Sequence, residues 1–148
     1  MNTVKVTRAK SNDVKKMAED VVFWCYNKLL PHHSTIHVDI DFKHIRQTGY
    51  DGLCEWQDTN VAPREFKITV HKGFGKKNII QTIIHEMIHV KQYAKGELAE
   101  RYRGGHTQYW NGVDHNKTKY EDQPWEIEAH DLEDALYEEY INYINSYG

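Results

Sequence analysis

Residues 78–96, with the sequence NIIQTIIHEMIHVKQYAKG, constrain the fold of this chain more than any other segment. The isoleucines and Met87 recur at three- and four-residue steps, the period of an α-helix with a broad apolar face. His85 and His89 fall within that apolar stripe, where a polar side chain is costly unless it has a partner. The segment therefore predicts a largely buried helix that carries two histidines into the interior of a domain.

The pattern around this helix predicts one α+β domain over residues 1–148. Apolar residues at helical spacing predict an N-terminal helix, and strict alternation, clearest in TIHVDIDFK, predicts strands with one buried face. Short connections between the strands are typical of a three-stranded antiparallel sheet. A polar, glycine-containing stretch then precedes a last helix that starts at Pro124. The expected elements are a helix over 11–30, strands over 35–43, 53–57 and 66–70, an irregular stretch over 97–123 and a helix over 124–148.

Composition narrows the class of protein. Charged residues make up 28% and hydrophobic residues 39% of the chain, which excludes a disordered or collagen-like protein. No window of 18 uncharged apolar residues occurs and the N-terminus lacks an apolar core, so we expect no membrane partner and a cytoplasmic location, in the host cell if the chain is viral. Cys25 and Cys54 lie too far apart for a zinc ribbon.

Charge is unevenly distributed along the chain. Residues 120–148 hold nine acidic residues and no lysine or arginine, so the rest of the chain, residues 1–119, is basic. A basic region can bind nucleic acid, but an acidic, solvated face on the last helix produces the same imbalance, so nucleic-acid binding has only weak support.

The motif His85-Glu86-Met87-Ile88-His89 has the form HExxH. Residues four apart share one face of a helix, so both imidazoles can reach one zinc ion, while Glu86 can meet a metal-bound water without binding the metal. Zinc lowers the pKa of such a water to roughly 7, and a carboxylate can then take its proton. A shuffled chain of this composition would contain the motif only about 0.05 times. The motif predicts a zinc site with Glu86 as general base and acid.

A catalytic zinc usually has three protein ligands and a water. On the C-terminal helix, Glu128 falls on the apolar stripe beside Trp125 and Ala129, whereas Glu126 falls on a polar face typical of solvated acids. A buried carboxylate is costly without a cation, which favours Glu128 as the third ligand. Asp131, one turn later, is a candidate to orient a ligand imidazole.

HEMIHVKQ followed by PWEIEA resembles the gluzincin metallopeptidases, and most closely a group of small HExxH proteins, many from viruses of bacteria, that also carry a YW-NG segment. The resemblance covers roughly residues 66–132. It implies a zincin-like fold, zinc as cofactor and peptide or protein substrates. It also implies His85, His89 and Glu128 as the zinc ligands, because in gluzincins a glutamate just before an alanine on a second helix completes the site.

A second resemblance keeps an alternative open. The segment Gly105-His106-Thr107 is similar to the glycine-histidine segment of SprT-like proteases, which act on DNA-associated proteins. It implies His106 as the third ligand in place of Glu128.

The function expected from these residues is zinc-dependent hydrolysis of peptide bonds. Two rivals remain, a regulatory or binding module whose zinc site turns over little, and a structural zinc protein, although the lack of a well-spaced fourth ligand favours catalysis. The stretch between the ligands offers four candidates to stabilise an oxyanion: Tyr109, Tyr120, His106 and His115.

Overall fold

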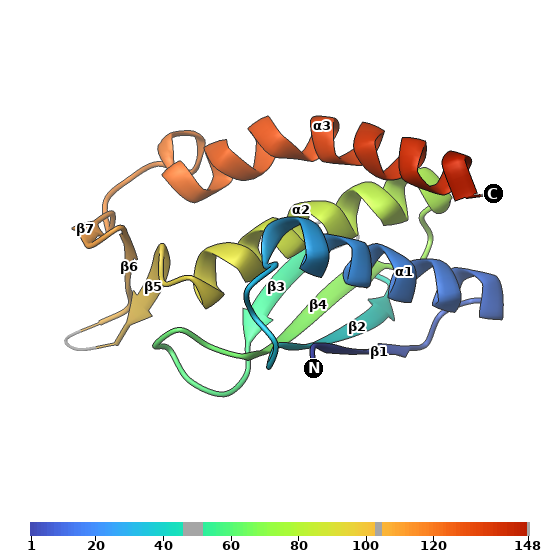
Figure 1. Ribbon diagram of the computed structural model, residues 1–148. Coiled ribbons are helices and arrows are strands. Elements are labelled where there is room, and N and C mark those ends of the chain that lie inside the picture. The colour runs from blue at the N-terminus through green and yellow to red at the C-terminus, as the bar shows by residue number, and fades with distance from the viewer. Residues whose placement is uncertain (46–51, 103–104, 148) are drawn as a thin grey trace.

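The computed structural model describes residues 1–45, 52–102 and 105–147 of the chain (Figure 1). The α+β class is confirmed. In chain order the elements are β1 (Thr3–Thr7), α1 (Asn12–Leu29), β2 (His37–Lys43), β3 (Gly52–Trp56), β4 (Glu65–His71), α2 (Lys76–Ala94), β5 (Leu98–Arg101), β6 (Thr107–Trp110), β7 (Val113–Asp114), the short 3-10 helix η2 (Tyr120–Asp122) and α3 (Pro124–Tyr147).

The main sheet has four strands in the order β1-β2-β4-β3, and it is mixed. β2 runs parallel to both β1 and β4, with Ile40 opposite Ile68, whereas β3 runs antiparallel to β4. The predicted three-stranded antiparallel sheet is therefore wrong. β3 follows β2 along the chain but lies beyond β4 at the edge, so β2 and β4 become neighbours that point the same way. The sequence analysis also missed β1, whose alternation of Val4 and Val6 is only five residues long.

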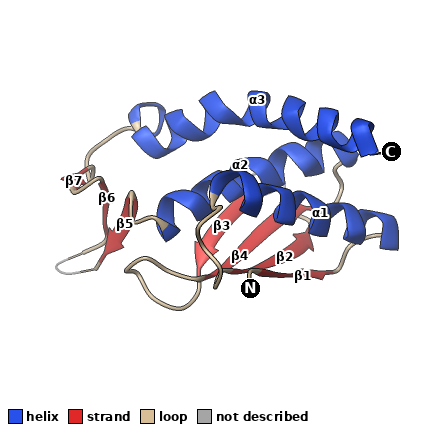
Figure 2. Ribbon diagram, in the orientation of Figure 1, coloured by secondary structure: helices blue, strands red, loops and turns tan. Residues whose placement is uncertain are grey.

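Helices α1 and α2 lie across one face of this sheet, and α3 lies on the far side of α2 (Figure 2). α2 is thus covered by the sheet, by α1 and by α3, which explains why it is apolar on more than one side. Ile83, Ile84 and Ile88 of α2 are completely buried, as are Ile40 and Ile68 of the sheet. Burial of each such side chain stabilises the fold by about 1.5–3 kcal/mol, so this layer positions α2 firmly.

The predicted helices are confirmed, with small shifts at their ends. Ser11 caps α1, because its Oγ accepts a hydrogen bond from the backbone N–H of Val14 at 3.2 Å. α2 begins at Lys76 after Gly75, two residues before Asn78, where the helical pattern of the sequence begins. Within the described ranges, no helix has an apolar stretch long enough to cross a lipid bilayer.

Residues 98–114 contain a second antiparallel sheet, β5-β6-β7, where irregular structure was expected. β6 and β7 are joined by Asn111 and Gly112, whose φ angles are 48° and 84°. An Asn-Gly pair with two positive φ angles suits a two-residue hairpin. This pair was the available sequence signal, but strands of four and two residues are too short to show alternation.

Candidate functional site

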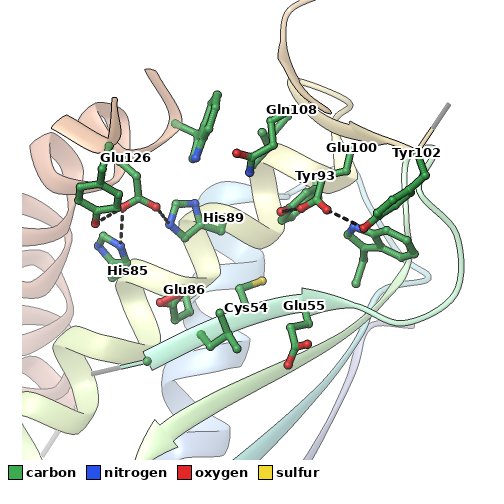
Figure 3. A pocket seen from close by; sticks show the side chains of 16 residues that line it. Cys54, Glu55, His85, Glu86, His89, Tyr93, Glu100, Tyr102, Gln108 and Glu126 are labelled. Carbon is green, nitrogen blue, oxygen red and sulfur yellow. Dashed lines mark hydrogen bonds and ion pairs between the residues drawn. The ribbon is translucent and has the colours of Figure 1, made fainter. Parts of the chain in front are cut away.

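Two histidines of α2 and one glutamate of α3 form a compact cluster. His89 Nε2 lies 2.9 Å from Glu126 Oε1, and His85 Nε2 lies 3.5 Å from Glu126 Oε2 (Figure 3). The ligand atoms of these three side chains all lie within 4.8 Å of one another. Two imidazole nitrogens and a carboxylate oxygen are a donor set that zinc accepts in catalytic sites. The three residues therefore can hold a metal ion.

The structure corrects the expected third member of this cluster from Glu128 to Glu126. Glu128 Oε1 instead accepts hydrogen bonds from Lys91 Nζ at 2.9 Å and from Gln92 Nε2 at 3.1 Å. The apolar stripe of α3 does face α2, as expected, but it meets α2 beyond the histidines, where Gln92 Nε2 also donates to the carbonyl of Trp125. The neighbouring polar stripe is the one that faces His85, and Glu126, expected to be solvated, has a side chain only 13% exposed.

The second nitrogen of each imidazole also has a partner. His89 Nδ1 lies 2.7 Å from Gln92 Oε1, and His85 Nδ1 lies 3.2 Å from Glu133 Oε2. Both partner atoms are acceptors, so each Nδ1 donates a proton, and each Nε2 faces Glu126, where it would serve as the ligand atom if a metal were bound. The candidate for this role, Asp131, is exposed on α3, and Glu133 takes the place expected for it.

The charges of the cluster are strongly coupled. Burial alone would raise the pKa of Glu126, but hydrogen bonds from His85 and His89 outweigh it and hold this pKa well below its usual range. Burial alone would lower the pKa of His85, yet the bond to Glu126 and the nearby Glu86 raise it to about 9. The site thus stabilises positive charge between its side chains, which is the property a cation site requires.

A second group of potential metal ligands shares His85. It consists of His85, His130 and Glu133, and His130 lies on the exposed side of α3 with 55% of its side chain accessible. Because His85 directs Nε2 toward Glu126, only its Nδ1 faces this group. The buried set with His89 and Glu126 is therefore the better candidate.

Glu86 is buried between α2 and β3, next to both histidines. Burial raises its pKa, and the neighbouring His89 and His85 oppose that shift. The close approach of β3 depends on Gly52, because a Cβ at that position would lie 2.5 Å from Thr82 Cγ2 and 3.4 Å from Glu86 Cγ. Glu86 lies outside the three-residue cluster, consistent with a group that contacts a metal-bound water.

The cluster opens into a pocket of about 670 Å³ between α2, β3, the small sheet and the start of α3. All five residues of β3 line it. Alternate side chains of a strand point to opposite faces of the sheet, so a pocket on one face alone would be lined by only every second residue. The pocket therefore runs along the free edge of β3. The other lining residues are His85, Glu86, His89, Tyr93, Leu98, Glu100, Tyr102, Gln108, Tyr120, Trp125 and Glu126.

The structure separates the four candidates for oxyanion stabilisation. Tyr120 lines the pocket, and its hydroxyl donates a hydrogen bond to Glu126 Oε2 at 2.8 Å. His115 instead packs against Trp125 and contacts Thr118, and the ring of Tyr109 lies under the guanidinium of Arg101. Only Tyr120, among these, lies beside the three-residue cluster.

His106 occupies the opposite end of the pocket region. Its Nε2 lies 3.0 Å from Glu100 Oε2, its ring stacks beside Tyr102, and about half of its side chain is exposed. The structure does not bring His106 to His85 and His89. The SprT-like ligand set therefore does not form in this arrangement.

Comparisons of the chain with protein-family models, with curated proteins and with solved structures found no match.

Proposed function

We propose that this protein is a zinc-dependent metallopeptidase with a zincin-like fold. The observation that carries the proposal is the convergence of His85 Nε2, His89 Nε2 and the Glu126 carboxylate from two helices, next to the buried carboxylate of Glu86. Three protein ligands leave a fourth position of a tetrahedral zinc open, as in catalytic sites. All three residues line the pocket, so a metal that they held would be accessible from it.

Bound zinc would supply a water of lowered pKa and would polarise the carbonyl of the substrate. The chain's own groups then divide the remaining work. Glu86 accepts a proton and passes it to the leaving amine, and burial raises the pKa of this carboxyl group, which strengthens it as a proton acceptor. Tyr120 is placed to donate its hydroxyl hydrogen to the developing oxyanion. Gln92 and Glu133 hold the imidazoles in the orientation that zinc needs.

The substrate class follows from the shape of the pocket. β3 is the last strand of its sheet, and its free edge forms one wall of the pocket. An extended peptide can add to such an edge through main-chain hydrogen bonds, independently of its sequence. A peptide placed there would pass its backbone by Glu86 at the Gly52 end of the strand.

The rival functions have less support. A structural zinc site is normally closed by four protein ligands, and the described residues supply three around an open pocket. An SprT-like site would need His106 near the two histidines, and it pairs with Glu100 instead. A binding module with an intact metal site makes the same geometric demands as an enzyme, so only turnover distinguishes the two.

The deciding experiment measures zinc content and peptide hydrolysis in wild type and in Glu86→Gln. We expect about one zinc per chain in both proteins, and cleavage of a peptide library by wild type alone, since the variant keeps the volume of the side chain and loses the proton acceptor. Glu65→Gln, on the exposed start of β4, is the matched control and should cleave normally. A Glu86→Gln protein that cleaves as fast as wild type would falsify the proposed mechanism.

A further inference from the structure

The end of the pocket farthest from the histidines has a distinct chemistry. Glu100 of β5 and Tyr102 lie there (Figure 3), the ring of Trp56 of β3 packs against Tyr102, and we refer to these three residues as the Glu100 subsite. Gly52 lies beside Glu86, and Trp56 follows four residues later on the same strand. At about 3.3 Å per residue, Trp56 of the subsite lies roughly 13 Å along the strand from Gly52, the residue beside Glu86.

The carboxylate of Glu100 is held in place by three neighbours. Tyr93 donates its hydroxyl hydrogen to Oε1, Tyr102 donates to Oε2 at 3.1 Å, and His106 Nε2 lies 3.0 Å from the same atom. A carboxylate offers about four acceptor positions, so one remains after these contacts. The side chain is only 14% exposed, which makes its negative charge effective at short range.

Among the residues that the structure describes, no lysine or arginine of the pocket wall neutralises Glu100. Among the described residues that line the pocket there are four glutamates and two histidines, but no lysine or arginine. A bound divalent cation would balance the negative charges of Glu86 and Glu126. The charge of Glu100 would remain, with His106 as its one ion-pair partner in the described ranges. Glu55 is not part of this imbalance, because it points to the other side of β3, where Lys67 lies opposite it.

Two aromatic rings complete the subsite. The ring centroids of Trp56 and Tyr102 lie 6.2 Å apart at an interplanar angle of 64°. Aromatic faces attract lysine and arginine side chains and also pack against their methylene stems. A buried carboxylate next to such rings selects a long cationic side chain over a neutral or acidic one.

We propose that the Glu100 subsite binds a lysine or arginine side chain of the peptide substrate. This inference rests on the proposed function, since it assigns a preference to the same pocket. A distance of roughly 13 Å corresponds to about four residues of an extended chain. A long basic side chain covers part of this distance itself. The basic residue should therefore lie about two to four residues from the cleaved bond. Pairing antiparallel to β3 places it on the N-terminal side of that bond.

The test measures binding and cleavage separately. Blocked alanine decapeptides carry a single lysine at successive positions, and matched peptides carry norleucine, which has a similar stem without the charge. Binding is measured calorimetrically with zinc-loaded Glu86→Gln, and cleavage with zinc-loaded wild type. We expect the best lysine peptide to bind about 10- to 100-fold more tightly than its norleucine partner, the range of a charge-assisted hydrogen bond.

Variants locate the preference. Glu100→Gln keeps the shape of the side chain and should reduce the lysine-to-norleucine ratio to near one. Tyr102→Leu, at a position more than half exposed and therefore safe for folding, should reduce the ratio in part. Glu65→Gln removes the same charge at the exposed start of β4, outside the pocket, and should leave the ratio unchanged.

The outcomes distinguish this inference from the proposed function. Preferential binding of lysine peptides that disappears in Glu100→Gln supports the subsite even if no peptide is cleaved. Cleavage of lysine and norleucine peptides at equal rates supports the peptidase and overturns the subsite. A preference that survives in Glu100→Gln and Tyr102→Leu, or that is lost in Glu65→Gln, also overturns it.

Discussion

Gln92 Oε1 lies 2.7 Å from Nδ1 of His89, and the amide nitrogen of the same Gln92 side chain donates to the carbonyl of Trp125. One fully buried side chain thus orients a candidate ligand of α2 and ties it to the first turn of α3. That turn carries Glu126, so the positions of the two ligands are linked through Gln92.

Gln92→Leu should weaken zinc binding by about 10- to 100-fold, the usual cost of losing a residue that orients a ligand imidazole. It should also lower the free energy of unfolding by about 1–3 kcal/mol, because the Trp125 carbonyl loses a buried donor. A competitive chelator titration and urea denaturation measure the two effects. Gln81→Leu, three turns earlier on α2, is the control. Equal zinc affinities in wild type and Gln92→Leu would contradict the assigned role.

Glu126→Ala should reduce zinc affinity more than any other single change on α3, since it removes a candidate ligand. Glu128→Ala should leave zinc affinity close to wild type and cost about 1–2 kcal/mol of stability, because Lys91 and Gln92 each lose a hydrogen-bond partner. Zinc titration of the two variants side by side compares glutamates only two residues apart. Loss of zinc in Glu128→Ala with retention in Glu126→Ala would refute the ligand set drawn from this structure.

Tyr120→Phe should lower kcat/KM for peptide hydrolysis by about 100-fold while zinc content stays the same, because the phenol hydroxyl, which lies in the pocket beside Glu126, is the proposed donor to the oxyanion. Tyr109→Phe is the control, since that ring lies under Arg101 away from the cluster. If both variants retain full activity, another group stabilises the oxyanion.

Gly52→Ala should lower stability by about 1–3 kcal/mol, because the new methyl group would overlap Thr82 Cγ2. It should also reduce peptide cleavage, since β3 must move away from α2 at the position of Glu86. Combining it with Thr82→Ser removes the overlapping methyl group and should restore both properties. Thermal melting and peptide cleavage of the single and double variants test this, and a double variant no better than Gly52→Ala would argue against the contact.

Asp41 gives a pH dependence of folding that is independent of the metal. Burial alone would raise its pKa, but Arg8, at 3.0 and 2.6 Å from its two oxygens, and Lys43 outweigh it and lower the pKa. A lowered folded-state pKa contributes stability above the unfolded value of about 3.9, and this contribution disappears as the pH falls through the folded value. The stability difference between wild type and Asp41→Asn should therefore be larger at pH 7 than at pH 3 in urea denaturation. A difference that is the same at both pH values would contradict the ion pair's role.

The parts of the fold that could be predicted are those whose pattern is local. Helical spacing located α1, α2 and α3, and alternation located β2 and β4. The order and direction of the strands could not be predicted, because a strand's pattern shows which face it buries and not which strand lies beside it. The Asn111-Gly112 hairpin had a local signal that short strands obscured.

The sequence by itself determined that His85 and His89 would lie together, because a spacing of four residues on one helix brings both imidazoles to the same face whatever surrounds it. Only the tertiary structure decided that Glu126 joins them, that Glu128 pairs with Lys91, and that His106 lies elsewhere. The choice between two glutamates on adjacent stripes of α3 depends on how far that helix is turned and displaced against α2. Side-chain packing at Trp125 and the hydrogen bonds of Gln92 set this position, and both require residues more than 30 positions apart to meet.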